Sequence, residues 1–514
     1  MPESRSLDKP DFLIAFSIAL GLFLYHVILS TLPGYGYFID ELYYIACSKR
    51  LAFGYIDHPP LSILLLALIR LVLGESLPAI RVVPAFALAA TVFFTGLLTG
   101  RLGGTRWAIV TACLAMVAMP VGLVMGSFYS MNAFEIAIWA VILYLAIRLL
   151  GEENPTYWVA IGILLGLGLE MKHTMAVYGI ALMAGMLLTP ARRLLRNRWF
   201  AWGVVSCAVL LLPNLIWQAV HGFPSLEFYR NAMVSKNIPK GALGILADQV
   251  LFANPLALPL WIAGLAVLLL SKRTEKYRSL GWTYCILLLV MILSGSSRPD
   301  RIAAIYPVLF AAGAVALHRI QPQTLRCWLT AAVVVLLSAG VLIVAPVFTP
   351  LLPPPTTSSM IASLGVPLSI ESGKTRDPLP QWLGDRLGWR ELAVEVSRVY
   401  RALPAEEQHN AVIISTNYGE AGALELYGEE LGLPPVFATH NSYHAWGPPP
   451  DSVRTYIGVF VNRRDLERRF ESLQEAGVQT CAYCTRPQQR IPIYVARGPR
   501  FSVTADWPSF KIFN

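Results

Sequence analysis

Asp40, Glu41, Asp57 and His58 lie in one short stretch directly after the first long apolar segment of the chain. Acidic side chains beside a bilayer are costly to keep, so this cluster indicates chemistry at a membrane surface. One of the carboxylates could act as a general base toward a hydroxyl or amine. Asp40, Asp57 and His58 could alternatively hold a divalent cation. The structural alternative is that Asp40 caps a helix.

Further candidates occur in later loops. Glu135 opens an apolar segment and should point into a helix bundle, or else stabilise the helix N-terminus. Lys172 could bind a phosphate, or reach along the membrane to the headgroups. His173 beside it is a weaker candidate. A long loop from residue 217 to 250 contains His221, which together with Tyr306 is a further candidate for contacting substrate.

A short basic loop with Arg298 and Arg301 precedes Tyr306-Pro307, which starts another apolar segment. Either arginine could bind a phosphate through paired hydrogen bonds, or anchor the chain at headgroup level. No GxxxxGK[ST] loop and no GxGxxG after a strand occurs, so soluble-nucleotide chemistry is not indicated.

The elements that must position these residues are membrane helices. The chain has 514 residues, of which 55% are hydrophobic and 14% charged, whereas soluble domains carry about 25% charge. Basic residues gather at the ends of apolar segments and not in a stripe with aromatics, which argues against nucleic-acid binding. About eleven spans are predicted at residues 12–32, 78–99, 107–124, 133–150, 157–171, 174–189, 200–216, 251–270, 280–295, 302–318 and 327–345.

The apolar run 61–73 is short and contains Arg70, so it is predicted to be a helix at the membrane surface. With the N-terminus inside, most loop arginines and lysines fall inside, as the positive-inside rule requires. Eleven spans then put the first loop, residues 33–60, and the C-terminal part outside.

The composition changes near residue 350, where Pro353-Pro354-Pro355 and the following Thr and Ser residues are typical of a linker. We therefore expect a membrane module at 1–349 and an outer α/β domain at 350–514. Strands are predicted at 411–415, 455–461 and 491–495, and a charged helix at 463–476. Cys481 and Cys484 form a CxxC that favours a structural disulfide if this end is outside, since zinc needs more ligands.

Several of these segments together resemble the GT-C glycosyltransferases, above all the glycosyltransferase 39 or protein-mannosyltransferase-like family with its aminoarabinose and rhizobial lipopolysaccharide transferases. The most specific part is D-E-x-Y-Y at 40–44 followed by G-Y-x-D-H-P-P-L at 54–61. Supporting matches lie at 131–135, 166–169 with Lys172, 212–218, 254–256 and 306–309.

The resemblance implies a GT-C membrane fold and a polyprenyl-phosphate-sugar donor, with inversion at the anomeric carbon when the acceptor attacks. It implies that Asp40 or Glu41 is the base and that Asp57 orients substrate or binds a metal. Tyr43, Tyr44 and His58 of the same motifs would contact substrate.

The hypothesis is thus a glycosyltransferase of the bacterial inner membrane, with its N-terminus cytoplasmic and its C-terminal domain periplasmic. The acceptor could be lipopolysaccharide, a lipid, another glycan or a protein. The rival hypotheses are a transporter or lipid flippase, which would place charges at the membrane midplane, and a structural subunit of an assembly.

Overall fold

The computed structural model describes residues 8–295, 298–365, 368 and 377–514, which form two compact units. The first unit comprises Met1–Leu32, Glu75–Ile216 and Ile238–Leu351, and the second comprises Pro33–Gly74, Trp217–Asn237 and Leu352–Asn514. The first loop is therefore folded together with the C-terminal part of the chain. This division by compactness differs from the predicted division by membrane topology near residue 350.

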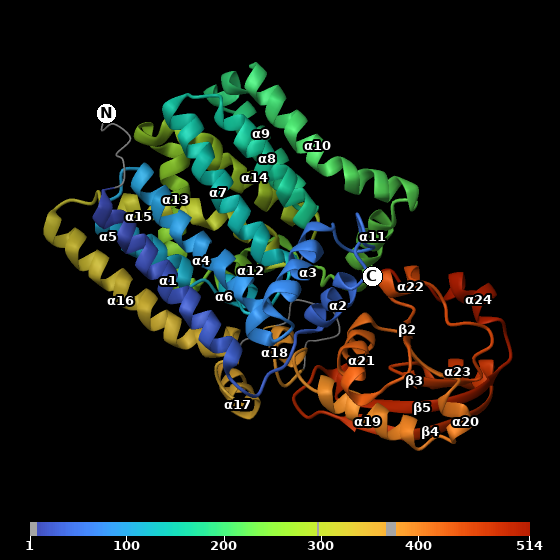
Figure 1. The fold of residues 1–514 in the computed structure, drawn as a ribbon. Coiled ribbons are helices and arrows are strands. Elements are labelled where there is room, and N and C mark those ends of the chain that lie inside the picture. The colour runs from blue at the N-terminus through green and yellow to red at the C-terminus, as the bar shows by residue number, and fades with distance from the viewer. Residues whose placement is uncertain (1–7, 296–297, 366–367, 369–376) are drawn as a thin grey trace. The chain divides into compact units, whose positions relative to one another are not determined.

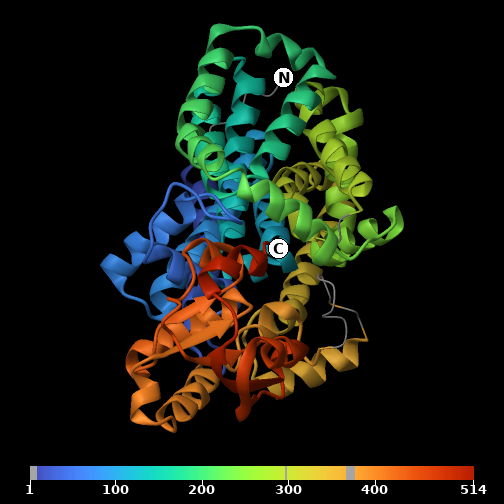
Figure 2. The same ribbon diagram turned by 90° about the vertical axis from the view of Figure 1, so that its right-hand side faces the viewer.

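The first unit is entirely helical in its described residues (Figures 1 and 2). Its α4 packs against α1, α5, α7 and α15 and so lies at the centre of the bundle. The elements are α1 (Lys9–Thr31), α4 (Leu77–Arg101), α5 (Arg106–Val117), α6 (Pro120–Gly126), α7 (Met131–Glu152), α8 (Tyr157–Met171), α9 (Met175–Leu187), η1 (Pro190–Leu195), α10 (Arg198–Val220), α12 (Ala242–Phe252), η2 (Pro255–Ala257), α13 (Leu258–Leu270), η3 (Lys272–Tyr277), α14 (Arg278–Leu293), η4 (Pro299–Ile305), α15 (Tyr306–Leu317) and α16 (Gln323–Phe348).

Helices α13 and α15 illustrate how this bundle is held together. A Cβ atom on Gly264 would lie 2.0 Å from the carbonyl oxygen of Leu309, and one on Gly313 would lie 1.9 Å from that of Leu260. Only glycine permits this approach of one backbone to the other. Small residues at such crossings are the usual means of association between helices that share a bilayer.

Seven helices in the described residues are long and apolar enough to cross a membrane, and up to nine spans result if each bent pair counts as one. The bent pairs are α5 with α6, at 66°, and α12 with η2 and α13, at 95°. Each of the eleven predicted spans falls on a helix or, at 107–124 and 251–270, on one of the bent pairs. Two of them, α8 and α9, have only 15 and 13 residues, which is short of the about 20 that a span needs. The predicted surface helix is α3 (Leu61–Leu73), also too short to cross.

Contacts inside the second unit join its three segments. The hydroxyl of Tyr43 hydrogen-bonds that of Ser442, and the Ser225 hydroxyl donates to the Tyr55 carbonyl oxygen. Segments that meet outside a bilayer are separated by an even number of crossings. If α8 and α9 either both cross or both do not, each bent pair must cross once. Under that condition each bent pair would be one span, which corresponds to the upper count of nine.

The second unit contains a five-stranded sheet with the order β2-β1-β3-β5-β4. Strands β2, β1 and β3 are parallel, whereas β5 is antiparallel to both β3 and β4. The strands are β1 (Ala411–Ser415), β2 (Val436–Ala438), β3 (Thr455–Val459), β4 (Phe470–Thr480) and β5 (Arg490–Pro499). The helices are α2 (Ile39–Ser48), α3 (Leu61–Leu73), α11 (Pro224–Ser235), α17 (Pro354–Leu364), α18 (Gln381–Gly384), α19 (Trp389–Arg401), α20 (Ala405–Gln408), α21 (Tyr418–Leu431), α22 (Asn441–Ala445), α23 (Arg463–Arg469), η5 (Arg486–Gln488), α24 (Val503–Asp506) and η6 (Trp507–Phe510).

The three predicted strands are confirmed as β1, β3 and β5, but two other predictions here are wrong. The charged helix predicted at 463–476 stops at Arg469, and its second half belongs to β4. Pairing with β5 overrides the helix-forming residues of that segment. The predicted linker at 353–359 is mostly α17, because proline is well tolerated in the first turn of a helix.

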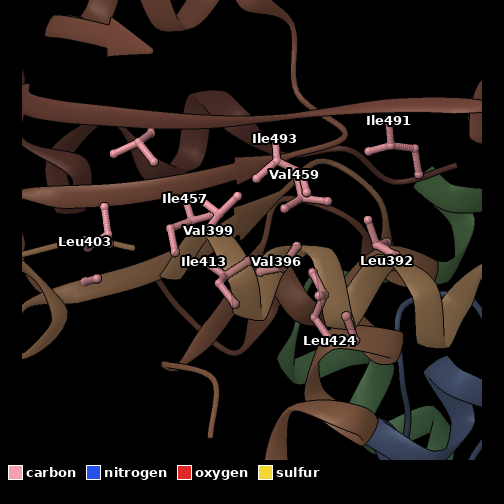
Figure 3. Packing of buried hydrophobic residues seen from close by; sticks show 13 residues of the cluster. Leu392, Val396, Val399, Leu403, Ile413, Leu424, Ile457, Val459, Ile491 and Ile493 are labelled. Atoms are coloured by element: carbon pink, nitrogen blue, oxygen red, sulfur yellow. The ribbon is translucent and has the colours of Figure 1, made fainter. Parts of the chain in front are cut away.

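One face of this sheet is covered by α19. Leu392, Val396 and Val399 recur at the spacing of one helical face, and all three are buried with Ile413, Ile457 and Ile493 of β1, β3 and β5 (Figure 3). The sheet and α19 thus form a core of their own within the second unit.

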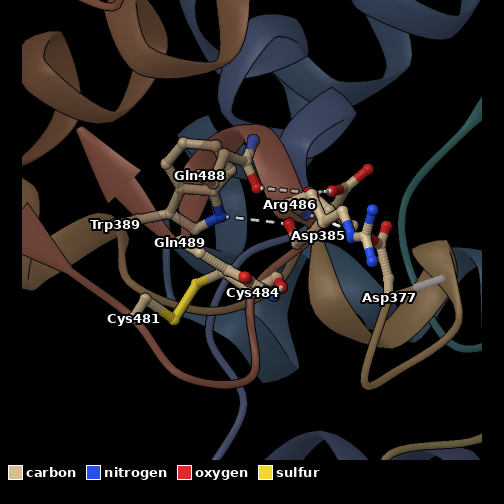
Figure 4. Close-up of a disulfide and its surroundings, with 9 residues drawn as sticks. Asp377, Asp385, Trp389, Cys481, Cys484, Arg486, Gln488 and Gln489 are labelled. Atoms are coloured by element: carbon tan, nitrogen blue, oxygen red, sulfur yellow. Dashed lines mark hydrogen bonds between the residues drawn. A yellow bond between two sulfur atoms is a disulfide. The ribbon is translucent and has the colours of Figure 1, made fainter. Parts of the chain in front are cut away.

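Cys481 and Cys484 form a disulfide in the turn that leads from β4 toward β5 (Figure 4). The backbone N–H of Cys481 donates to the Gln489 carbonyl oxygen, and the Gln489 amide donates to that of Cys484. The nearby Trp389 at the start of α19 donates its indole N–H to the Asp385 carbonyl oxygen. The disulfide therefore closes the turn beside the end of the main helix of the domain.

Replacing both cysteines with serine is expected to destabilise the second unit by about 2 kcal/mol, from the entropy of closing so short a loop. Chemical unfolding of the oxidised protein and of the double variant, followed by circular dichroism, would measure the difference. Reduction of the wild-type protein should give the same loss. An unchanged unfolding midpoint in both experiments would contradict the expectation.

Candidate functional site

The two adjacent carboxylates at the start of helix α2, Asp40 and Glu41, have different surroundings. Glu41 is fully buried, and its Oε2 accepts the backbone N–H of Phe38 at 2.7 Å. This is the reciprocal bond that a Glu in the first turn makes to close a helix N-terminus. Asp40, one residue earlier, is partly exposed. The capping role predicted as an alternative for Asp40 therefore falls to Glu41.

Asp40 is held from the C-terminal part of the same unit. The hydroxyl of Tyr418, the first residue of α21, donates to Asp40 Oδ1 at 3.0 Å. The two helices approach closely because a Cβ on Gly422 would lie 2.9 Å from the carbonyl carbon of Leu42. The Tyr418 ring lies between those of Tyr43 and His440, with centroids 4.7 and 4.8 Å away. The carboxylate is thus oriented while it stays accessible to solvent.

A second network fixes Asp57. Its Oδ1 lies 2.8 Å from the hydroxyl of Tyr43, and that hydroxyl lies 2.7 Å from Ser442 Oγ and accepts the Ser442 backbone N–H. Burial, reinforced by the negative charge of Asp57, raises the pKa of Tyr43 well above its usual range. Tyr43 therefore stays protonated and donates to Asp57. The backbone N–H of Ile56 also donates to the Ser442 hydroxyl.

His58 is fully buried among aromatic rings, with centroids 4.7 Å from Tyr44, 4.8 Å from Tyr55 and 5.7 Å from Tyr43. Its Nε2 lies 3.8 Å from Asp57 Oδ1, beyond hydrogen-bond distance. Burial lowers the pKa of His58, although Asp57 opposes this shift. The imidazole is therefore neutral at physiological pH and holds the aromatic cluster around Tyr43 and Tyr44.

The predicted cation ligands are not gathered into one set. Across residues 8–295, 298–365, 368 and 377–514, no group of three or more His, Cys, Asp or Glu side chains is arranged to hold a metal ion. Asp40 turns toward Tyr418, whereas Asp57 turns toward Tyr43. Asp40, Asp57 and His58 therefore do not form such a group in the described residues, because each carboxylate is oriented by a different tyrosine.

His440 supports the other side of the Tyr418 ring. Its Nδ1 accepts the backbone N–H of Tyr418, and its Nε2 lies 3.1 Å from the side-chain oxygen of Asn514. Lys236 lies 5.9 Å from the centroid of the Tyr418 ring. Burial first, and then the charge of Lys236, lowers the pKa of His440 to about 3, with the contacts to Asn514 opposing the shift.

A neutral buried histidine makes stability depend on pH. Between about pH 6.5 and pH 3 the unfolded chain binds a proton at residue 440 that the folded protein does not, so stability falls as the pH is lowered through this window. We expect His440→Gln to lose less stability over it than the wild type, in chemical unfolding at several pH values. His409→Gln, at an exposed histidine of the same unit, is the matched control. A wild-type pH profile in the His440 variant would refute the assignment.

In the first unit, Glu135 and Lys172 form a buried ion pair. Lys172 Nζ lies 2.6 Å from Glu135 Oε2, and the two side chains are 9% and 2% exposed. The Thr174 hydroxyl donates to Glu135 Oε1 at 2.5 Å. Glu135 points into the bundle as predicted, while Lys172 turns inward and does not reach toward headgroups. His173 contacts the side-chain oxygen of Asn214 at 3.0 Å.

Element η4 places further charges in the same unit, packed against α7. Arg298 Nε donates to Asp300 Oδ1 at 3.0 Å. Lys172 and Arg301 also interact electrostatically with the Asp300 carboxylate, and Arg301 interacts with Glu135. Five charged side chains thus form one cluster, namely Glu135, Lys172, Arg298, Asp300 and Arg301.

The two remaining predicted substrate contacts, Tyr306 and His221, each contact a neighbouring side chain. Tyr306 is buried, with its hydroxyl 3.0 Å from Gln249 Oε1. His221 is exposed and stacks on the ring of Trp217 at a centroid distance of 4.2 Å.

Sequence reasoning did not assign Tyr418, Ser442, His440, Thr174 or Asp300 to the site. Tyr418 lies 378 residues from Asp40, and Ser442 lies 399 residues from Tyr43, so no local pattern links these partners. Residues 417–421, which loosely resemble the same family, offered the one available signal.

Comparison with known proteins identifies a matching family model and similar folds. Residues 57–217 match the family model of dolichyl-phosphate-mannose-protein mannosyltransferases. No curated protein sequence matches the chain significantly.

Three solved structures are similar in fold. ArnT from Cupriavidus metallidurans, solved with undecaprenyl phosphate, has a TM-score of 0.61 at 13% identity, covering 94% of this chain and 97% of its own. The apo state of that protein gives the same TM-score and identity, with 93% and 97% covered. The apo oligosaccharyltransferase of Archaeoglobus fulgidus has a TM-score of 0.52 at 14% identity, and the match covers 81% of this chain and 63% of that one. The chain is therefore a multi-pass membrane protein with the fold of the GT-C glycosyltransferases.

Proposed function

We propose that the protein is an inverting glycosyltransferase that moves a sugar from a polyprenyl-phosphate donor to an extracytoplasmic acceptor, with Asp40 as general base. The observation that carries this proposal is the position of Asp40. It is a partly exposed carboxylate, oriented by the Tyr418 hydroxyl at 3.0 Å, in the first loop of a GT-C fold. Glu41, the rival base, is buried and committed to its helix cap.

In the proposed reaction, the oxygen of an acceptor hydroxyl attacks the anomeric carbon of the donor sugar. The new C–O bond forms as the bond to the phosphate oxygen breaks, and the electron pair leaves with the polyprenyl phosphate. The acceptor proton passes to Asp40. Phosphate is a good leaving group, so one base suffices and a second carboxylate acting as acid is unnecessary. Attack opposite the departing phosphate inverts the configuration.

Asp57, Tyr43 and Tyr44 would position substrate beside this base. The network of Asp57 with Tyr43 and Ser442 is rigid because every member is buried or half-buried and hydrogen-bonded. His58 supports the network from behind and stays neutral. Such supporting contacts hold a site in its productive geometry.

The donor phosphate would be bound by the charged cluster of the first unit. Three cations and two carboxylates leave it one positive charge in excess, and Arg298 keeps about a quarter of its side chain exposed. Arginine suits a phosphate because its planar fork donates two parallel hydrogen bonds. Lys172 contributes charge while its amine is bonded to Glu135. The undecaprenyl phosphate in the ArnT structure supports this class of donor.

The positive-inside pattern supports a cytoplasmic N-terminus, and an odd number of spans before the first loop and before the C-terminal domain would then put both on the opposite, periplasmic side of a bacterial inner membrane.

The test is transfer of a radiolabelled sugar by the purified full chain. Membranes that contain endogenous polyprenyl-phosphate sugars supply the donor, and delipidated envelope glycans, lipids and proteins are offered as acceptors in separate reactions. We expect label in one acceptor fraction and release of the polyprenyl phosphate. Movement of the intact donor across a vesicle bilayer without sugar transfer would instead support a flippase.

A further inference from the structure

A cavity of about 380 Å³ lies in the second unit, apart from the contacts of Asp40. Its volume falls within the range of pockets that hold small ligands, about 300–1,000 Å³. Its chemically distinctive lining residues are Arg50, Glu425, Glu429, Phe437, Tyr443 and Trp446. We name it the Glu425 pocket. None of these residues has a role in the proposed transfer.

The polar groups of the Glu425 pocket are fixed before any ligand arrives. Arg50 Nη1 donates to Glu425 Oε1 at 2.9 Å, and the Tyr443 hydroxyl donates to Glu425 Oε2 at 2.9 Å. The Arg50 guanidinium also lies 4.3 Å from the centroid of the Trp446 ring. Burial and the Glu425 charge raise the pKa of Tyr443 well above its usual range, so this hydroxyl stays protonated.

The charges of the pocket are balanced in pairs. Arg50 neutralises Glu425, and Lys49 neutralises Glu429 at 2.5 Å. A charged ligand would have to disrupt one of these pairs, so the pocket favours an uncharged one. The remaining surface combines aromatic rings and Pro434-Pro435 with carboxylate acceptors and guanidinium donors.

An uncharged molecule with an apolar face and a rim of hydroxyl groups matches this surface. A sugar ring has that shape, since its C–H groups pack on aromatic rings while each hydroxyl both donates and accepts a hydrogen bond. An extended peptide fits less well. Adding a strand requires a long free sheet edge, whereas β2, which contributes Phe437, has only three residues.

The pocket is connected to the candidate base through α2. Arg50 follows Asp40 by ten positions along and just beyond this helix, roughly 15 Å at the helical rise. The rings of Tyr443 and Tyr43 are also neighbours, with centroids 6.3 Å apart. A ligand in the pocket and an acceptor hydroxyl at Asp40 would therefore belong to an extended molecule.

We propose that the Glu425 pocket binds an uncharged sugar residue of the acceptor, at a distance from the residue that receives the transferred sugar. The identification of this sugar as part of the acceptor rests on the proposed function. The binding of a sugar in the pocket does not. It identifies the acceptor as a glycan of several residues, in preference to a bare lipid or an unmodified protein.

The experiment measures binding of methyl glycosides of glucose, galactose, mannose and N-acetylglucosamine to the full chain in lipid nanodiscs, by saturation-transfer NMR. We expect at least one glycoside to bind the wild type and to bind Glu425→Gln about tenfold more weakly. Arg50→Gln, at a more exposed position, should give a similar loss if the first variant folds poorly. The matched controls are Glu430→Gln and Arg390→Gln, which remove members of an ion pair from α21 and α19 outside the pocket.

Binding of no glycoside, or an equal loss in the pocket and control variants, would overturn the proposal. Binding of an uncharged tripeptide but of no glycoside would do so as well. Asp40→Asn separates this inference from the transfer reaction, because it should slow transfer by about 10²–10⁴-fold and leave glycoside binding unchanged. Failure of only one readout then identifies which of the two proposals is wrong.

Discussion

Asp40→Asn is expected to lower the rate of sugar transfer by about 10²–10⁴-fold, which is the usual contribution of a general base. Asparagine keeps the size of the side chain and can still accept the Tyr418 hydroxyl through its amide oxygen. It cannot take the proton of the acceptor. The fold should therefore persist while the reaction slows, with little change in donor binding.

Glu41→Gln is the matched control for this variant. Its amide oxygen can still accept the Phe38 N–H, so the cap of α2 is weakened but not removed. We expect near-normal transfer and a loss of stability on the order of 1 kcal/mol. Single-turnover transfer of labelled sugar, with circular dichroism as the folding check, separates the two effects. Full activity of Asp40→Asn would exclude Asp40 as the base. Inactivity of a folded Glu41→Gln would assign that role to Glu41.

Lys172→Met is expected to destabilise the first unit by about 3–5 kcal/mol. Methionine fills similar space but removes the cation bonded to the buried Glu135 carboxylate, which keeps the Thr174 hydroxyl and its longer-range interaction with Arg301. A buried charge that loses its bonded partner is among the costliest single defects. Chemical unfolding in detergent micelles measures the loss.

Removing both charges should restore most of that stability, because Lys172→Met with Glu135→Leu takes away both members of the buried pair and leaves the net charge of the cluster unchanged. Arg193→Met tests the specificity of the effect, since it breaks the exposed Arg193–Glu153 pair and should cost at most about 1 kcal/mol. An equally small loss of stability for Lys172→Met would contradict the large cost expected for breaking the buried pair.

The sequence was most informative where a pattern is local. Apolar runs located the membrane helices, and β-branched residues located β1, β3 and β5, because burial in each case recurs along a short segment. The helix predicted at 463–476 failed because the pairing partner of β4 follows it in the chain and could not be read from that segment. The same limit applies to Asp40 and Glu41. Their neighbourhood suggests one base, but choosing between them required the Phe38 amide and the distant Tyr418.

The first loop cannot make its contacts with Ser442 and α21 until most of the protein has been synthesised. Tyr43 and its partner Ser442 are 399 residues apart, so at about 5–20 residues per second a ribosome needs on the order of 20–80 s between them. During this interval Leu42, Tyr43, Tyr44 and Ile45 of α2, all buried in the finished unit, have no α21 to pack against. Assembly of the candidate site is therefore a late step, which depends on translation of the distal part of the chain.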